Sequence, residues 1–455
     1  MQANILFIFL TIFAGQLQAQ SDRIFTASEI ESDLKYLQAK LVEMHPNLYT
    51  HSKPEAIQHY FDETINDLPP SLTSTEAYRA IAGISSVLKD GHTLINPPAD
   101  FWEQTDGFFP FKVFWDGKAL FIERNFSGNP EIENGSQIVS INGITGTEVI
   151  DIMLSGMMRD GDNLNYPIWV INTFFTTYYG YFFGHSTQFK LELIKPFGES
   201  QKVQVAGSSF AEIRERRKDL YPGQDVFSRP IGRGIYLEFK EDTRTAILTI
   251  PDFHVSILKK EYGQRFSKVI RSIFNEIEVL NPDKLILDLR HNQGGSIRNG
   301  RLLLSYLMDK PFQLVEGYNK VAQKEGTETG RLKSVRGSQM GVFKPKPNAF
   351  PGELIVLING GSFSNSGIVC NALETQHRAF FIGEETGGNR SILSSDTKTV
   401  KLPETEIQVE IPTLQYVLNR DFGSGGVVPD ILMQASIRQL VEERDIVLEA
   451  AMNKK

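Results

Sequence analysis

The sequence has little cysteine and no excess of basic residues. One cysteine, Cys370, occurs among 455 residues, so the chain can form neither an internal disulfide nor a cysteine-based zinc site. The eight histidines show no metal-binding spacing such as His-Glu-x-x-His, and we expect no metal and no organic cofactor. A net charge of −8 without a dense Lys/Arg run excludes nucleic acid as a partner, because phosphate contacts need a basic face.

Long apolar runs are lacking as well. Residues 5–14 form an apolar run that is too short to span a bilayer but suits the core of a signal peptide cleaved after Ala19. We therefore expect residues 1–19 to be a signal peptide and the protein to be exported, to the periplasm, the cell envelope or the outside. No later segment is long and apolar enough to be a membrane span. The alternative for residues 5–14 is a buried N-terminal helix.

What the chain does have is enough apolar sequence to build large cores. Hydrophobic residues make up 41% and charged residues 22%, which is typical of a folded globular protein. The length exceeds what one core supports and predicts two or three domains. Cys370 lies in an apolar helical pattern and is expected to be a small buried core residue.

Residues 24–105 predict a helical N-terminal domain. Two capping-box patterns, 26–29 and 73–76, each precede apolar residues spaced along one helical face. Gly91 is expected to end the second helix as its C-terminal cap. His92, in the stretch LKDGHT, would then emerge directly after a rigid helix.

Residues 108–207 predict a small β-domain. Five strand-like runs fall at 112–115, 119–123, 137–141, 188–194 and 202–205. The stretch IENGSQIVSINGITGTEVIDIM resembles the PDZ pattern, in which a small barrel binds a peptide as an added strand. An aromatic insertion, NYPIWVINTFFTTYYGYFF, is expected to form the core of a helical hairpin rather than a substrate-binding wall.

Residues 230–452 predict an α/β domain. The runs GIYLEF and TAILTI indicate an antiparallel pair, and KLILDL, ELIVLI and AFFIG are short continuous apolar runs typical of strands buried on both faces. Helical patterns at 261–280 and 436–452 flank this sheet, which makes the fold class α/β (α+β) and multidomain.

Two loops of this domain carry residues suited to acyl-transfer chemistry. Gly294 and Gly295 follow a buried strand, and paired glycines let backbone N–H groups point at an oxyanion. Ser364 lies where a strand turns sharply into a helix, in the stretch GGSFSNSG, with helix N-terminal amides nearby. The structural alternatives are an ordinary strand-to-helix turn and serines that merely cap the helix. The sequence is not the Gly-x-Ser-x-Gly elbow of α/β-hydrolases.

Together with GEETGGN and GSGGVVPDI, these loops resemble the landmarks of the C-terminal processing, or tail-specific, serine proteases. The resemblance implies a ClpP/crotonase-like α/β protease core after the PDZ-like domain. It also implies that Ser364 is the nucleophile. The N–H groups of Gly295 and Asn365, with Gly294 alongside, would form the oxyanion hole.

The resemblance also indicates the general base. Members with a Ser-Lys dyad carry a lysine in the Gly-rich turn where this chain has Asn389, which cannot act as a base. The tricorn-like branch uses a histidine from the helical N-terminal part, and His92 matches that position. By the same resemblance the residue that orients the imidazole comes late in the chain, and we expect Asp421, with Glu384 as second choice.

The sequence thus predicts an exported serine endopeptidase that acts on polypeptides, whose C-terminal tails the PDZ-like domain would hold. An alternative is a binding protein without turnover, because interphotoreceptor retinoid-binding proteins resemble the same core and bind apolar ligands. A crotonase-type acyl-CoA enzyme is a third and more remote class. The sequence does not define the oligomeric state or the natural substrate.

Overall fold

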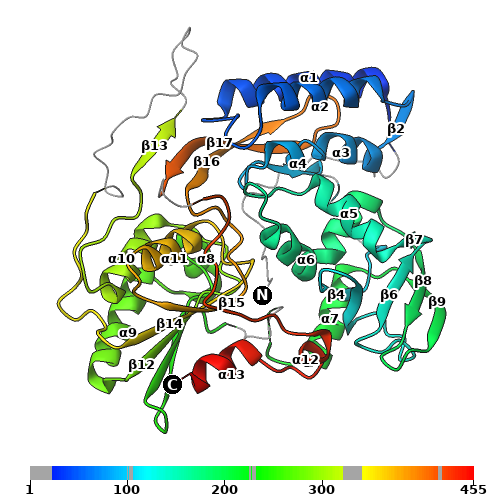
Figure 1. Ribbon diagram of the computed structural model, residues 1–455. Helices are drawn as coiled ribbons and strands as arrows, with labels where there is room; N and C mark the ends of the chain where they lie inside the picture. The colour runs from blue at the N-terminus through cyan, green and yellow to red at the C-terminus, as the bar shows by residue number, and fades with distance from the viewer. Residues whose placement is uncertain are drawn as a thin grey trace.

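The computed structural model describes residues 23–99, 101, 106–224, 227, 232–320, 341–418 and 423–454. The described chain is a mixed α/β, multidomain structure with several separate sheets (Figure 1). The predicted signal peptide lies outside the described residues. No helix among those described is long and apolar enough to cross a membrane.

The C-terminal half is built around one six-stranded sheet with the order β10-β11-β12-β14-β15-β18. Its strands are β10 (Tyr236–Lys240), β11 (Thr245–Thr249), β12 (Lys284–Asp288), β14 (Glu353–Ile358), β15 (Phe380–Gly383) and β18 (Ile431–Leu432). The predicted antiparallel pair is confirmed as β10 and β11, and the three short apolar runs are confirmed as parallel strands.

Both faces of this sheet are buried. One face packs against four helices, α8 (Val255–Tyr262), α9 (Phe266–Leu280), α10 (Ile297–Leu307) and α11 (Asn365–Thr375). The other face packs against α13 (Ile446–Asn453). Cys370 is fully buried on α11, as predicted, and burial raises the pKa of its thiol. Burial on both sides explains why these strands are continuously apolar rather than alternating.

Two predicted helices of this half are each divided. The expected helix at 261–280 is α8 followed by α9, because Gly263 adopts a left-handed conformation (φ 65°) that ends α8. The expected helix at 436–452 is α12 (Ile437–Val441) followed by α13. The side chain of Asp445 caps α13 by accepting from the N–H of Leu448.

The N-terminal part consists of α1 (Ala27–Met44), α2 (Pro54–Asn66), α3 (Ser74–Ala82) and α4 (Ser85–Leu88), with a strand pair β1 (Ile24–Thr26) and β2 (Ser71–Thr73). Both predicted capping boxes are confirmed, at α1 and α3. The predicted cap at Gly91 is wrong. Lys89 adopts the left-handed conformation that ends α4 (φ 53°), and Gly91 serves a different purpose, described below.

A second β-region follows. Its sheet has the order β4-β5-β6-β8-β9, with β7 (Ile144–Thr145) paired to β6. All five predicted strands are present, as β4 (Phe111–Trp115), β5 (Leu120–Asn125), β6 (Gln137–Ile141), β8 (Gln188–Ile194) and β9 (Ser200–Ala206). Helices α5 (Gly146–Gly156) and α7 (Phe210–Leu220) belong to the same stretch.

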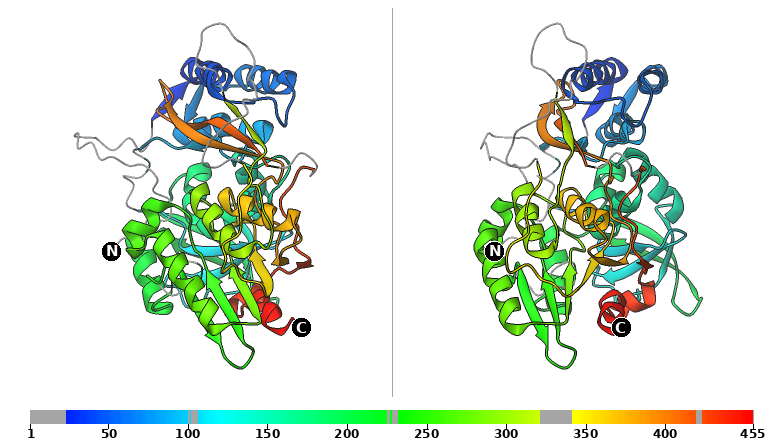
Figure 2. Two further views of the ribbon diagram at one scale, coloured as in Figure 1. Left: turned by 90° about the vertical axis from the view of Figure 1, so that its left-hand side faces the viewer. Right: turned by 60° about the vertical axis from the view of Figure 1, so that its left-hand side comes forward.

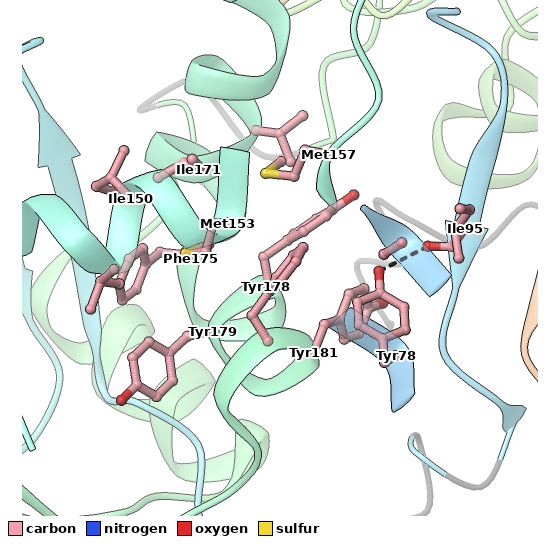
Figure 3. Packing of buried hydrophobic residues seen from close by; sticks show 14 of the residues in the cluster. Tyr78, Ile95, Ile150, Met153, Met157, Ile171, Phe175, Tyr178, Tyr179 and Tyr181 are labelled. Carbon is pink, nitrogen blue, oxygen red and sulfur yellow. Dashed lines mark hydrogen bonds between the residues drawn. The ribbon is translucent and has the colours of Figure 1, made fainter. Parts of the chain in front are cut away.

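The aromatic insertion forms one helix, α6 (Asn165–Phe183), kinked at Phe174, rather than a hairpin. Its rings are core residues, as predicted, and Figure 3 shows Phe175, Tyr178, Tyr179 and Tyr181 packed among aliphatic and methionine side chains of the surrounding helices. The cavity between Tyr78, Tyr166 and Tyr178 has a volume of only about 10 Å³, which is room for one water molecule.

A third sheet joins the two ends of the chain. Its strands β13 (Gly317–Lys320), β17 (Gln408–Val417) and β16 (Ile392–Lys401) come from the C-terminal half, but β3 (Leu94–Asn96) pairs antiparallel with β17. Figures 1 and 2 show the orange β16–β17 hairpin lying beside the blue N-terminal helices. The buried Asp33 of α1 accepts from the N–H groups of Glu404 and Thr405 at the hairpin turn, at 2.9 and 2.8 Å.

Candidate active site

Ser364 lies on a strained turn between β14 and α11. Its backbone (φ 53°, ψ −120°) falls in a region that non-glycine residues rarely adopt, at a cost of roughly 1–3 kcal/mol. Such a turn projects the side chain away from the sheet at the N-terminus of the following helix. The sequence lacks the Gly-x-Ser-x-Gly motif, but Ser364, like the serine of that motif, lies on a strained turn between a strand and a helix.

The serines of this turn do not cap the helix, which was the structural alternative for them. Ser364 makes no side-chain capping bond, and the Ser366 hydroxyl is buried without a partner among the described residues. Ser362 instead donates to the carbonyl of Leu289 at 2.9 Å, which ties the turn to the end of β12. The first amide of α11, that of Asn365, makes no hydrogen bond within the part of the chain that the structure describes.

The Gly294–Gly295 loop packs directly against this turn. A Cβ atom on Gly294 would lie 2.7 Å from both the Asn365 nitrogen and Ser364 Cβ, so only glycine fits there. The N–H of Gly294 donates to Asn292 Oδ1 at 2.9 Å and is therefore occupied. The placement of Gly294 alongside the oxyanion hole stays a prediction, in which this residue provides close approach of the two loops. The N–H of Gly295 makes no hydrogen bond among the described residues.

His92 faces Ser364 from the N-terminal part of the chain. Its Nε2 lies 3.1 Å from Ser364 Oγ, across a separation of 272 residues. The pairing of β3 with β17 brings the loop there, because β3 begins only two residues after His92. The Tyr78 hydroxyl adds a second anchor by donating to the Ile95 carbonyl at 2.9 Å, the dashed line in Figure 3.

The environment of the imidazole favours its neutral form. Burial lowers the pKa of His92 below its ordinary value, while the charge of Asp90 opposes that shift. Phe363 stacks on the ring with centroids 5.0 Å apart, and Tyr166 of α6 stacks on Phe363 at 4.0 Å. Nδ1 of His92 is buried and has no hydrogen-bond partner among the described residues.

Two buried carboxylates flank the loop that carries His92. Asp90 accepts the backbone N–H of His92 at 2.9 Å, and Asp160 lies against Gly91, where an added Cβ would be 2.9 Å from the Asp160 Cγ. Burial, and secondarily the charge of Asp90, raises the pKa of Asp160 to about 8. Gly91 therefore makes room for a carboxyl group that is mostly protonated near neutral pH. Neither aspartate was singled out from the sequence, although an Asp two residues before a functional His is a typical turn-forming residue.

The remaining predicted residues are placed as follows. Asp421 lies outside the described residues, so its role stays a prediction. Glu384 makes no hydrogen bond with His92 in the described part of the chain. Burial raises its pKa to about 7, and Arg290 partly offsets that rise. Asn389 stands in the Gly-rich turn, where its N–H donates to Asp160 Oδ2 at 3.1 Å.

Two further histidines, His291 and His254, have structural partners. His291 Nδ1 accepts from Trp169 Nε1 at 2.8 Å, and His254 lies 2.9 Å from Asp252. Among the described residues, no group of three or more His, Cys, Asp or Glu side chains could hold a metal ion.

Residues 244–433 match the model of peptidase family S41. The matched segment contains five of the six strands of the large sheet, all but β10, together with the glycine loop and the Ser364 turn. Within this segment the chain is similar to this family of serine-type peptidases.

The relatives found by sequence are processing proteases. One is a carboxyl-terminal-processing protease of Picosynechococcus sp., 26% identical over 191 residues that cover 41% of this chain and 41% of that protein. Another is the chloroplastic carboxyl-terminal-processing peptidase 2 of Arabidopsis thaliana, 23% identical over 46% of this chain and 42% of that protein. The match thus spans about two fifths of the length of these relatives.

The fold is similar over a much larger part of the chain. The crystal structure of mature CPAF superposes with a TM-score of 0.65 and 15% identity, covering 94% of this chain and 98% of that one. At this identity the similarity concerns the fold alone. It extends beyond the segment that matches the S41 model to the N-terminal helices and the second β-region.

Proposed function

We propose that this protein is a serine endopeptidase that hydrolyses peptide bonds of polypeptide substrates. The observation that carries the proposal is the 3.1 Å contact between His92 Nε2 and Ser364 Oγ at a strained strand-to-helix turn. A hydroxyl needs a neighbouring base with a pKa near the operating pH, and an imidazole held neutral meets that need.

The residues act in the following order. His92 Nε2 takes the proton of Ser364 as Oγ forms a bond to the peptide carbonyl carbon. The N–H groups of Gly295 and Asn365 donate to the oxyanion, a contribution worth on the order of 100-fold or more in rate per donor. His92 then gives its proton to the leaving amine. A water molecule, deprotonated by His92, releases the acyl group and restores Ser364.

The second β-region and the N-terminal segment complete the proposal. We assign the sheet β4–β9 with α5 as a PDZ-like module that holds an extended substrate chain, a role supported by the sequence pattern and by relatives named as processors of carboxyl termini. Export through the signal peptide at residues 1–19 and Asp421 as the third catalytic group are parts of the same proposal that rest on sequence alone.

The alternative of an apolar-ligand carrier is less well supported. The aromatic rings of α6 are packed in the core, and the cavity beside them has a volume of about 10 Å³, too small for such a ligand.

The test is covalent labelling by a fluorophosphonate serine probe. We expect the unaltered protein to be labelled, and Ser364→Ala and His92→Ala to lose labelling by at least roughly 1,000-fold while remaining folded. Ser366→Ala and His254→Ala are matched controls, because these neighbours lie outside the proposed chemistry. An unaltered protein that resists the probe between about pH 6 and pH 9 would contradict the proposal.

A further inference from the structure

The loop that carries His92 is held by one buried carboxylate with an unusual number of partners. Asp90 Oδ1 accepts from the backbone N–H of His92 at 2.9 Å and from the Thr93 hydroxyl at 3.1 Å. Asp90 Oδ2 accepts from the Ser394 hydroxyl of β16 and lies 3.3 Å from His45 Nε2. Asp90 therefore joins the end of α1, the His92 loop and the β16 strand at one point.

The partners are fixed in orientation. His45 Nδ1 accepts the N–H of Asn47 at 3.3 Å, so in the neutral ring the proton is on Nε2, which faces Asp90. His45 and Asp90 are 6% and 7% exposed, so the charge is held in a region of low dielectric, where it acts strongly on neighbouring groups.

The negative charge of this region belongs to Asp90. Burial alone would raise its pKa, but the contacts with His45 and Ser394 lower the pKa of Asp90 overall, well below its ordinary value. The nearby Asp160 has the opposite shift, with its pKa raised to about 8, and is mostly protonated near neutral pH. The other titratable groups around the loop are His51, Lys89 and Asp162, of which Lys89 and Asp162 pair with each other at 2.6 Å.

The imidazole has no other charged partner within the described part of the chain. Its Nδ1 makes no hydrogen bond there, and one face of its ring is covered by the Phe363 ring. A group that becomes an imidazolium during the reaction needs a compensating charge nearby.

We propose that Asp90 is a positioning residue for His92, which fixes the imidazole through its backbone and supplies the negative charge that stabilises the imidazolium. This inference rests on the proposed function of Ser364 and His92. It assigns to the buried His45–Asp90–Ser394 cluster an electrostatic role in addition to its role in packing, and it does not depend on which residue contacts Nδ1.

The experiment compares Asp90→Asn with Ser394→Ala. Both variants remove a contact of the cluster, but only the first removes the charge. The readouts are the rate of fluorophosphonate labelling between about pH 4 and pH 9 and the NMR titration of the His92 ring.

We expect Asp90→Asn to lower the plateau rate by at least about 10-fold and to move the acid limb, which reports the His92 pKa, to lower pH. The sign follows because loss of a nearby anion disfavours the imidazolium. Ser394→Ala is expected to leave the acid limb in place. Should Asp90→Asn not fold, Asp90→Ser carries the same test, because a serine hydroxyl can still accept the N–H of His92.

The outcomes separate the two proposals. If the unaltered protein is labelled and Asp90→Asn shows the same rate and acid limb, the role of Asp90 is refuted while the peptidase proposal stands. If the unaltered protein is not labelled, the peptidase proposal fails. The NMR titration alone then decides whether Asp90 stabilises the charged form of His92. A His92 pKa that falls in Asp90→Asn then supports the role of Asp90, and an unchanged pKa refutes it.

Discussion

The two halves of the candidate site are positioned by different means. Ser364 is fixed by its own backbone, between a strand buried on both faces and the helix that follows it within one residue. His92 is fixed by contacts with distant parts of the chain, through β17, Asp90 and the aromatic stack on Phe363. The comparison teaches that the proposed nucleophile is placed by local geometry, whereas the position of the proposed base depends on tertiary structure.

The largest effect is expected where the local geometry of the Ser364 turn is broken. Gly294→Ala would place a Cβ atom 2.7 Å from backbone and Cβ atoms that cannot move aside, at a residue with φ of 100°. We expect the labelling rate to fall by about 100-fold or more. Gly367→Ala is the control, because nothing lies within 4 Å of its added Cβ. Equal rates for the two variants would show that the turn is not as constrained as described.

A smaller effect is expected on the side of His92. Gly91→Ala places a Cβ atom 2.9 Å from the Asp160 side chain, which can shift more readily than backbone. We expect a loss of labelling rate of about 10-fold, and partial recovery in Gly91→Ala with Asp160→Ala, because the two sites are in contact. Strictly additive losses would indicate that Gly91 is needed for a reason other than space.

The raised pKa of Asp160 leads to a prediction about how the stability of the folded protein depends on pH. With its pKa raised to about 8 in the folded state, the folded protein holds a proton that the unfolded chain releases near its ordinary value of 3.8. Stability is therefore lost as the pH rises from about 4 to about 8. Asp160→Asn removes this loss, and we expect its Tm to exceed that of the unaltered protein by a few degrees near pH 8, and by less near pH 5. A Tm difference independent of pH would contradict the assignment.

The smallest effect is expected at the exposed edge of the same loop. Lys89 pairs with Asp162 at 2.6 Å, but the Asp162 side chain is 84% exposed, and such pairs contribute little. Lys89→Ala should change Tm by less than about 1 °C and leave the labelling rate within about 2-fold. A larger loss would mean that the surface of the loop, and not only its buried contacts, positions His92.

The same contrast explains what the sequence could predict. Strands β12, β14 and β15 were evident because burial on both faces leaves an uninterrupted apolar run, and the capping boxes of α1 and α3 are local patterns. The Ser364 turn was found because its residues are contiguous. His92 was chosen as the general base through the family resemblance, because no local pattern links it to Ser364.

What could not be predicted depends on distant pairing or on space. β16 is largely polar, and its neighbour β17 pairs with β3 across some 300 residues, a contact that no local pattern encodes. Gly91 was interpreted as a helix cap because a glycine after a helix usually has that role. Here a residue without a side chain is needed because Asp160 lies too close for a Cβ atom. The charge of Asp90 became apparent only when His45 and Ser394 were seen beside it.

The pairing of β3 with β17 has a consequence for the biosynthesis of the protein. His92 is synthesised before Ser364, and β17, the strand that holds the His92 loop beside Ser364, is synthesised after both. A nascent chain that still lacks β17 therefore carries the serine and the histidine without this contact, and the pair forms only when β3 meets β17. A peptidase of the kind proposed would in this way be inert while its own chain is still unfolded. The fluorophosphonate probe, added at intervals during refolding, should label Ser364 only after the native β3–β17 contact has formed.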